Sequence, residues 1–147
     1  MAHYVMGDIH GEADRFHAML EKNHLSEEDT LILLGDVIDR GPDGIALLLE
    51  IMEMPNAIML LGNHEYMMLD ALDSNNISTS KLYQWYRNGG ECTHEYLKHI
   101  RKETRRAIFD YLKALPLNYE IEVGGKQYKL VHASPIENFH TYGKGHY

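Results

Sequence analysis

The sequence predicts an α/β fold that begins with three parallel strands alternating with helices. Three short apolar runs carry this prediction, at residues 4–6, 31–34 and 58–61. Each run is followed by glycine and then by a segment with helical periodicity, an order typical of buried parallel strands joined by helices. Because 147 residues correspond to about one domain, we expect a single domain over residues 1–147.

The segments between these runs have the spacing of amphipathic helices. In the first, Ala13, Phe16 and Leu20 share one face. The second follows the i, i+3, i+4, i+7 pattern through Ile45, Leu48, Leu49 and Met52. Crossovers between parallel strands are right-handed, so we expect a β-α-β-α-β start with neighbouring strands in one sheet.

The second half of the chain changes character. A polar loop is expected over 73–80, followed by an aromatic helical piece over 82–86 that is broken at residues 88–90. Helices are expected at about 91–100 and 102–115, where Pro116 ends the second. Strict alternation from Leu117 and a two-residue Gly124-Gly125 turn then predict a β-hairpin.

Composition excludes several classes of protein. The chain has 14 Lys and Arg against 22 Asp and Glu, a net charge of −8, which argues against general nucleic-acid binding. No apolar run approaches the ~20 residues of a membrane span. The single cysteine, Cys92, excludes a disulfide framework and a multi-cysteine zinc site. We therefore expect a cytoplasmic chain without a membrane partner; the oligomeric state stays open.

Each predicted parallel strand ends in a polar signature, and these ends should meet at one edge of the sheet. The signatures are Gly7-Asp8-Ile9-His10-Gly11, Gly35-Asp36-Val37-Ile38-Asp39-Arg40-Gly41 and Gly62-Asn63-His64-Glu65, and the hairpin adds Val131-His132. Carboxylate, amide and imidazole ligands without thiolates suit manganese, iron or zinc. We expect these metal ligands to be Asp8, His10, Asp36, Asn63 and His132. The two oxygens of Asp36 can bridge two ions, which would polarise a phosphoryl group and activate water.

Three further residues suit phosphoryl chemistry. The planar fork of Arg40 fits phosphate oxygens, and Asn63 is a second candidate for phosphate binding. His64 can protonate a leaving alkoxide as general acid, and Asp39 can orient its ring. Two simpler interpretations stay open here, because Asn63 can cap a helix and His132 can be a core histidine.

These signatures, in this order and with a later Val131-His132-Ala133, resemble those of the metallo-dependent phosphoprotein phosphatases among the calcineurin-like phosphoesterases. The likeness is greatest to the bacterial and phage branch, which also includes symmetrical diadenosine tetraphosphate hydrolases; Trp85, residues 88–90 and Thr93 resemble that branch too. The resemblance implies a mixed β-sandwich flanked by helices.

The resemblance also implies a distribution of ligands. One metal would be held by Asp8, His10 and Asp36, and the second by Asp36, Asn63 and His132. Arg40 would bind phosphate, while His64 and Asp39 would form the acid pair.

The activity that the resemblance implies is hydrolysis of phosphate monoesters by metal-activated water. We expect a serine/threonine phosphoprotein phosphatase with two divalent ions, manganese first and iron or zinc as alternatives. Its partner would be a phosphoprotein or a small phosphorylated substrate. Two alternatives stay open: a symmetrical diadenosine tetraphosphate hydrolase, and a truncated, catalytically impaired chain that binds metal or phosphate.

The sequence departs from the family pattern in two places. Ser134 follows Ala133 where the family usually has glycine. The family also has a further phosphate-binding arginine and a Gly-His ligand downstream, whereas no arginine follows His132 and only His146 follows a glycine. We therefore expect the C-terminal part of the family domain to be missing.

Overall fold

In the described part of the chain, the first three strands form a parallel sheet. The computed structural model describes residues 2–73, 75 and 77–133; His146 and Ser134 lie outside this range. Strands β1 (His3–Met6), β2 (Thr30–Leu33) and β3 (Ala57–Met59) pair in the order β1-β2-β3. The α/β class and the β-α-β-α-β start are confirmed.

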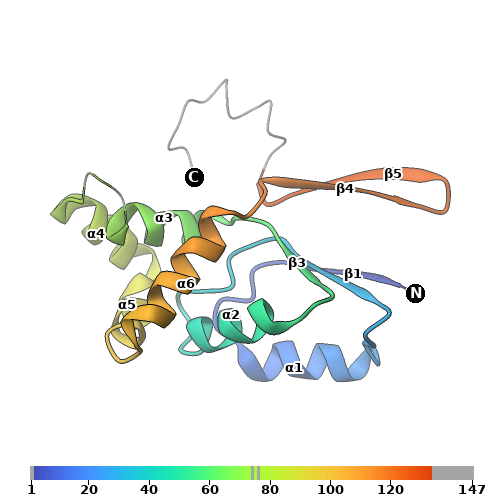
Figure 1. Ribbon diagram of the computed structural model, residues 1–147, viewed down its shortest axis with the longest axis horizontal. Coiled ribbons are helices and arrows are strands. Elements are labelled where there is room, and N and C mark those ends of the chain that lie inside the picture. The colour runs from blue at the N-terminus through green and yellow to red at the C-terminus, as the bar shows by residue number, and fades with distance from the viewer. Residues whose placement is uncertain (1, 74, 76, 134–147) are drawn as a thin grey trace.

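Two helices cover one face of this sheet. Helices α1 (Ala13–Lys22) and α2 (Gly44–Glu53) connect successive strands. Since both crossovers run in the same direction across the sheet, right-handedness places both helices on the same side, as Figure 1 shows. The helical periodicity predicted which residues face the sheet. Phe16, Ile45 and Leu48 are indeed buried in the core, together with Leu31 and Leu33 of β2.

Within the described residues, four further helices and a π-turn follow β3, and Figure 1 shows this part of the chain beyond the ends of the strands. They are α3 (Asn63–Leu72), α4 (Thr79–Trp85), the π-turn η1 (Tyr86–Gly90), α5 (Glu91–Leu97) and α6 (Lys102–Lys113). Both α5 and α6 pack against α2, and α6 also contacts α3. No helix among the described residues is long and apolar enough to cross a membrane.

One boundary differs from the prediction. The loop expected over 73–80 ends early, because the Ser78 hydroxyl accepts the Lys81 N–H at 3.2 Å and starts α4 at Thr79. The break expected at residues 88–90 is confirmed. Gly89 has a φ of 101°, a non-helical conformation that separates two helices at a kink within η1.

The predicted hairpin is present. Strands β4 (Asn118–Val123) and β5 (Lys126–Val131) pair antiparallel, with Val123 opposite Lys126 across the two-residue turn. Within the described residues the hairpin forms a sheet separate from the parallel one. Its end returns to the parallel sheet, since His132 Nδ1 lies 2.7 Å from the Leu34 carbonyl oxygen just after β2.

An ion-pair cluster joins the end of α3 to α6. Arg106 donates to the Asp73 carboxylate at 3.1 Å, and Lys113 also contacts it. The hydrogen bond from Lys113 lowers the pKa of the Asp73 carboxyl, burial raises it and Arg106 lowers it again, with a net pKa below the ordinary value.

Replacing Asp73 with asparagine is expected to lower the free energy of unfolding by about 0.5–1 kcal/mol at pH 7. A carboxyl with a depressed folded-state pKa stabilises the fold above its unfolded pKa of about 4. This stabilisation is lost as the pH falls through the folded-state value. Urea unfolding of both chains at pH 7, 5 and 3 measures the effect. A difference that persists undiminished at pH 3 would contradict it.

Candidate metal centre

The loops that follow the three parallel strands meet through their backbones. The His10 N–H donates to the Asp36 carbonyl oxygen at 2.9 Å, and the Gly11 N–H donates to that of Val37 at 2.7 Å. The His64 N–H, at the start of α3, donates to Asp36 Oδ1 at 3.0 Å. The three signatures therefore converge as predicted and are in direct contact. The loop that follows β2, here called the second loop, contacts both of the others.

The backbone of these loops is unusual for residues with side chains. Six described residues other than glycine have positive φ, and five of them belong to the site; the sixth is His24. The five are Asp8 (50°), His10 (45°), Asp36 (57°), Asp39 (74°) and Arg40 (71°). Left-handed backbone is costly for such residues and is concentrated at functional sites.

Glu65 holds the second loop in this conformation. Its side chain is 0% exposed and accepts the N–H groups of Asp36 at 2.7 Å, Val37 at 2.9 Å and Ile38 at 3.2 Å. Burial raises the pKa of Glu65 to about 7, with the Asp36 charge adding to the effect and the backbone hydrogen bonds opposing it. No role for Glu65 is predicted from the sequence, although this residue completes the Gly-Asn-His-Glu signature.

Replacing Glu65 with glutamine is expected to lower the free energy of unfolding by about 1–3 kcal/mol. The amide has one acceptor end only, so at least one buried N–H of the loop loses its partner. Glu122, exposed on β4, supplies the control, because the same exchange there should stay within about 0.5 kcal/mol. Equal unfolding midpoints of the two variants in urea would show that the loop does not depend on the carboxylate.

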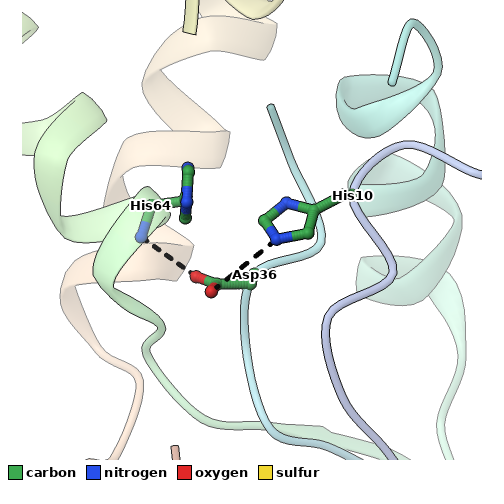
Figure 2. Close-up of side chains that lie close together, drawn as sticks. All are labelled: His10, Asp36 and His64. Carbon is green, nitrogen blue, oxygen red and sulfur yellow. Dashed lines mark hydrogen bonds and ion pairs between the residues drawn. The ribbon is translucent and has the colours of Figure 1, made fainter. Parts of the chain in front are cut away.

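Asp36 is the common point of the side-chain cluster. It is 5% exposed, and His10 Nε2 lies 3.9 Å and His132 Nε2 3.1 Å from its Oδ2 atom. Figure 2 shows Asp36 between His10 and His64, whose rings stand edge to face with centroids 4.7 Å apart. Burial raises the pKa of Asp36, but hydrogen bonds from His132 and the His64 N–H bring it below its ordinary value.

The three histidines around Asp36 are held through the same ring atom. Each has its Nδ1 atom engaged by an oxygen: His10 by Ile38 O at 2.9 Å, His132 by Leu34 O at 2.7 Å and His64 by Asp39 Oδ2 at 2.8 Å. An acceptor at Nδ1 fixes that nitrogen as the donor, which leaves Nε2 of a neutral ring as the ligand atom. The contact with Asp36 raises the pKa of His132, against the lowering effect of burial.

Asn63 completes the cluster from the first turn of α3. One end of its amide lies 2.9–3.0 Å from both carboxylate oxygens of Asp36 and from His132 Nε2. The amide nitrogen can donate to the Asp36 oxygens; with the amide in the opposite orientation, its oxygen would serve as a metal ligand. Gly62, not Asn63, occupies the N-cap position, so capping does not account for Asn63.

This donor set fits divalent metal ions. One ligand atom each of Asp8, Asp36 and His132 lies within 4.8 Å of the others, and so does one each of His10, Asp36 and His64. Carboxylate and imidazole donors with oriented rings are the ligands of manganese, iron and zinc sites. The sequence placed His10 with Asp8 and left His64 outside the metal shell, whereas these groups pair Asp8 with His132 and His10 with His64. Asp36 belongs to both groups in either arrangement.

Asp39 and Arg40 lie on opposite sides of the second loop. Asp39 is 0% exposed and holds the His64 ring, as the sequence predicted. Arg40 is exposed and lines a cavity of 640 Å³ together with Asp8, His10 and Arg15. The guanidinium predicted to bind phosphate therefore shares a cavity with two predicted metal ligands.

Comparison with known proteins identifies the family. Residues 1–143 match the family described as calcineurin-like phosphoesterase. The chain belongs to this family. Its resemblance to the phosphatase branch is confirmed as well, since proteins named serine/threonine-protein phosphatase are among its relatives.

Two curated relatives match the chain over different lengths. Serine/threonine-protein phosphatase 2 of Salmonella typhimurium is 32% identical over 142 residues, which cover 96% of this chain and 62% of that protein. The symmetrical bis(5'-nucleosyl)-tetraphosphatase of Hamiltonella defensa is 42% identical over 71 residues, 47% of this chain and 26% of that protein. This calcineurin-like phosphoesterase thus spans less than two thirds of either relative.

The fold also has solved counterparts. A metallophosphoesterase from Sphaerobacter thermophilus superposes with a TM-score of 0.54 at 19% identity, covering 82% of this chain and 42% of that one. The sheet and helices described above therefore share the fold of this solved structure.

Proposed function

We propose that this calcineurin-like phosphoesterase hydrolyses phosphate monoesters with two divalent metal ions held around Asp36. The proposal rests on the position of Asp36, whose carboxylate faces His10, His64 and His132 at the junction of three loops. Asp8, His10, Asn63 and His132 would complete the metal ligands. Bound ions would polarise the phosphoryl group and activate water. The oxygen and imidazole donors favour manganese, with iron and zinc as alternatives.

The chain's own residues supply the other parts of the reaction. The Arg40 guanidinium, open to the cavity, would bind two phosphate oxygens with its planar fork, and Asn63 is a second phosphate contact. With both ring nitrogens protonated, His64 would donate its Nε2 proton to the leaving oxygen, while its Nδ1–H is held by Asp39.

The proposed substrate is a phosphoserine or phosphothreonine side chain of a protein. Similarity to the Salmonella serine/threonine phosphatase extends over 96% of this chain, whereas similarity to the Hamiltonella tetraphosphatase covers 47%. Hydrolysis of diadenosine polyphosphates is the second candidate, favoured by the higher identity of that shorter match. One cysteine in the whole chain agrees with a reducing cytoplasm as the proposed location.

Metal removal and substrate comparison test this proposal. Hydrolysis of 4-nitrophenyl phosphate should disappear on chelation and return with manganese. The specificity constant for a phosphoserine peptide should exceed that for diadenosine tetraphosphate at least ~10-fold. The reverse ratio would favour the tetraphosphatase. Manganese binding without hydrolysis of any substrate would favour a chain that binds metal or phosphate without catalysis.

A further inference from the structure

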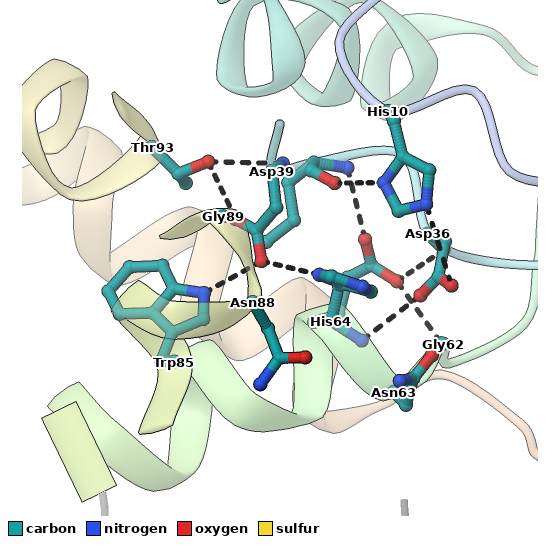
Figure 3. Close-up of polar contacts among 12 residues, drawn as sticks. His10, Asp36, Asp39, Gly62, Asn63, His64, Trp85, Asn88, Gly89 and Thr93 are labelled. Atoms are coloured by element: carbon teal, nitrogen blue, oxygen red, sulfur yellow. Dashed lines mark hydrogen bonds and ion pairs between the residues drawn. The ribbon is translucent and has the colours of Figure 1, made fainter. Parts of the chain in front are cut away.

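The environment of Asp39 contains two contacts that the proposed reaction does not use. His64 Nδ1 and Trp85 Nε1 each lie 2.8 Å from Asp39 Oδ2, while the Thr93 hydroxyl donates to Oδ1 at 2.7 Å. The same hydroxyl accepts the Asp39 backbone N–H at 3.1 Å. Figure 3 shows Trp85, Thr93 and His64 around this carboxylate. In the described part of the chain, no lysine or arginine pairs with Asp39, so these neutral donors and His64 are its partners.

The local fold places the Trp85 N–H and the Thr93 hydroxyl against the Asp39 carboxylate. Trp85 is the last residue of α4 and Thr93 lies in α5, on the two sides of the kinked π-turn η1. The indole lies flat against Gly90, where an added Cβ atom would lie 2.3 Å from Trp85 Nε1. Only glycine leaves room for the ring there. Trp85 is 0% and Thr93 3% exposed, so water cannot replace either donor without a rearrangement.

Two donors on one carboxylate restrict its rotation. With Oδ1 held by Thr93 and Oδ2 shared by Trp85, the carboxylate has one orientation in which both hydrogen bonds persist. Nδ1 of His64 is held by the same Oδ2 atom, so the imidazole plane follows the carboxylate. The direction of the opposite nitrogen, Nε2, is thereby fixed relative to Asp36.

We propose that Trp85 and Thr93 are positioning residues that fix the Asp39 carboxylate and, through it, the direction in which His64 donates its proton. The inference rests on the proposed function. In that reaction a water oxygen bonds to phosphorus and the bond from phosphorus to the leaving oxygen breaks. The leaving oxygen keeps the electron pair and takes a proton from His64 Nε2. The attacking water releases a proton to solvent, and His64 regains one from it.

Paired variants of Thr93 test the proposal through the leaving group. Thr93→Val keeps the shape and removes the hydroxyl, whereas Thr93→Ser keeps the hydroxyl. With manganese, Thr93→Val should lower kcat ~10–100-fold for a phosphoserine peptide. The loss should be less than ~3-fold for 4-nitrophenyl phosphate, whose leaving group needs little protonation. Thr93→Ser should restore most of the peptide activity, and Trp85→Phe should behave like Thr93→Val. Equal losses on both substrates, or a parallel loss of manganese affinity, would overturn the proposal.

A second readout does not depend on turnover. In the ¹⁵N-labelled chain the His64 Nδ1 proton, assigned by its absence in His64→Gln, should be protected from exchange with water. It should remain visible by NMR in Thr93→Ser and broaden in Thr93→Val and Trp85→Phe. An unchanged resonance in both of the latter variants, with the fold retained in circular dichroism, would overturn the positioning role. This result stands even if the unaltered chain hydrolyses none of the substrates, an outcome that instead rejects the proposed function.

Discussion

Replacing Asp36 with asparagine is expected to weaken manganese binding at both proposed positions and to lower turnover at least ~10³-fold. Asp36 belongs to both groups of ligand atoms. Asparagine keeps the size of the side chain and the acceptor for the His64 N–H, but it lacks the negative charge and the second oxygen that a bridging ligand needs. The loss should therefore be chemical and leave the fold in place.

Calorimetric titration with manganese, elemental analysis after gel filtration and kcat on 4-nitrophenyl phosphate measure this effect. Asp14→Asn is the matched control, because Asp14 is exposed on α1. The same exchange there should change neither manganese binding nor kcat. Unaltered manganese stoichiometry together with unaltered turnover in Asp36→Asn would rule out a centre built on this residue.

Replacing His64 with glutamine is expected to lower kcat ~10²–10⁴-fold for alkyl phosphates. Glutamine can still donate to Asp39, but it has no proton to give to a leaving alkoxide. Aryl phosphates, whose leaving groups need less protonation, should lose less. Manganese affinity should hardly change if His64 is the general acid.

The position of His64 beside His10 and Asp36 gives this experiment a second possible outcome. A ligand role predicts lost manganese and the same loss of kcat on both classes of substrate. His17→Gln controls for the chemical change, since His17 is exposed on α1 and pairs with Glu50 at 2.8 Å. Stepwise titration of the two variants separates the two roles of His64.

The convergence of the site was predictable because it depends on topology. Parallel strands that end in polar signatures bring those signatures to one edge of the sheet, so Asp8, His10, Asp36 and Asn63 could be grouped from their order alone. His132 could be added because hairpin alternation placed it at the end of a strand. The assignment of particular histidines to one ion or the other stays a prediction; it depends on ring orientations that the Ile38 and Leu34 carbonyl groups set.

The supporting residues could not be found in the same way. Glu65 acts on backbone N–H groups 27 to 29 positions away, and backbone groups carry no signal in a sequence. Trp85 is a core aromatic with 0% exposure, and only the direction of its N–H, toward Asp39, reveals a second role.

The left-handed backbone at five site residues has a consequence for protein engineering. At Asp8, His10, Asp36, Asp39 and Arg40 the residue that best fits the backbone is glycine, which relieves a cost of order 1 kcal/mol at each position. At the exposed positions Asp8 and Arg40, stability and chemistry therefore select opposite residues. A search for thermostable variants that scores folding alone would enrich glycine there and return a sturdier protein without its chemistry. Libraries made from this chain should keep these five positions fixed and seek stability elsewhere.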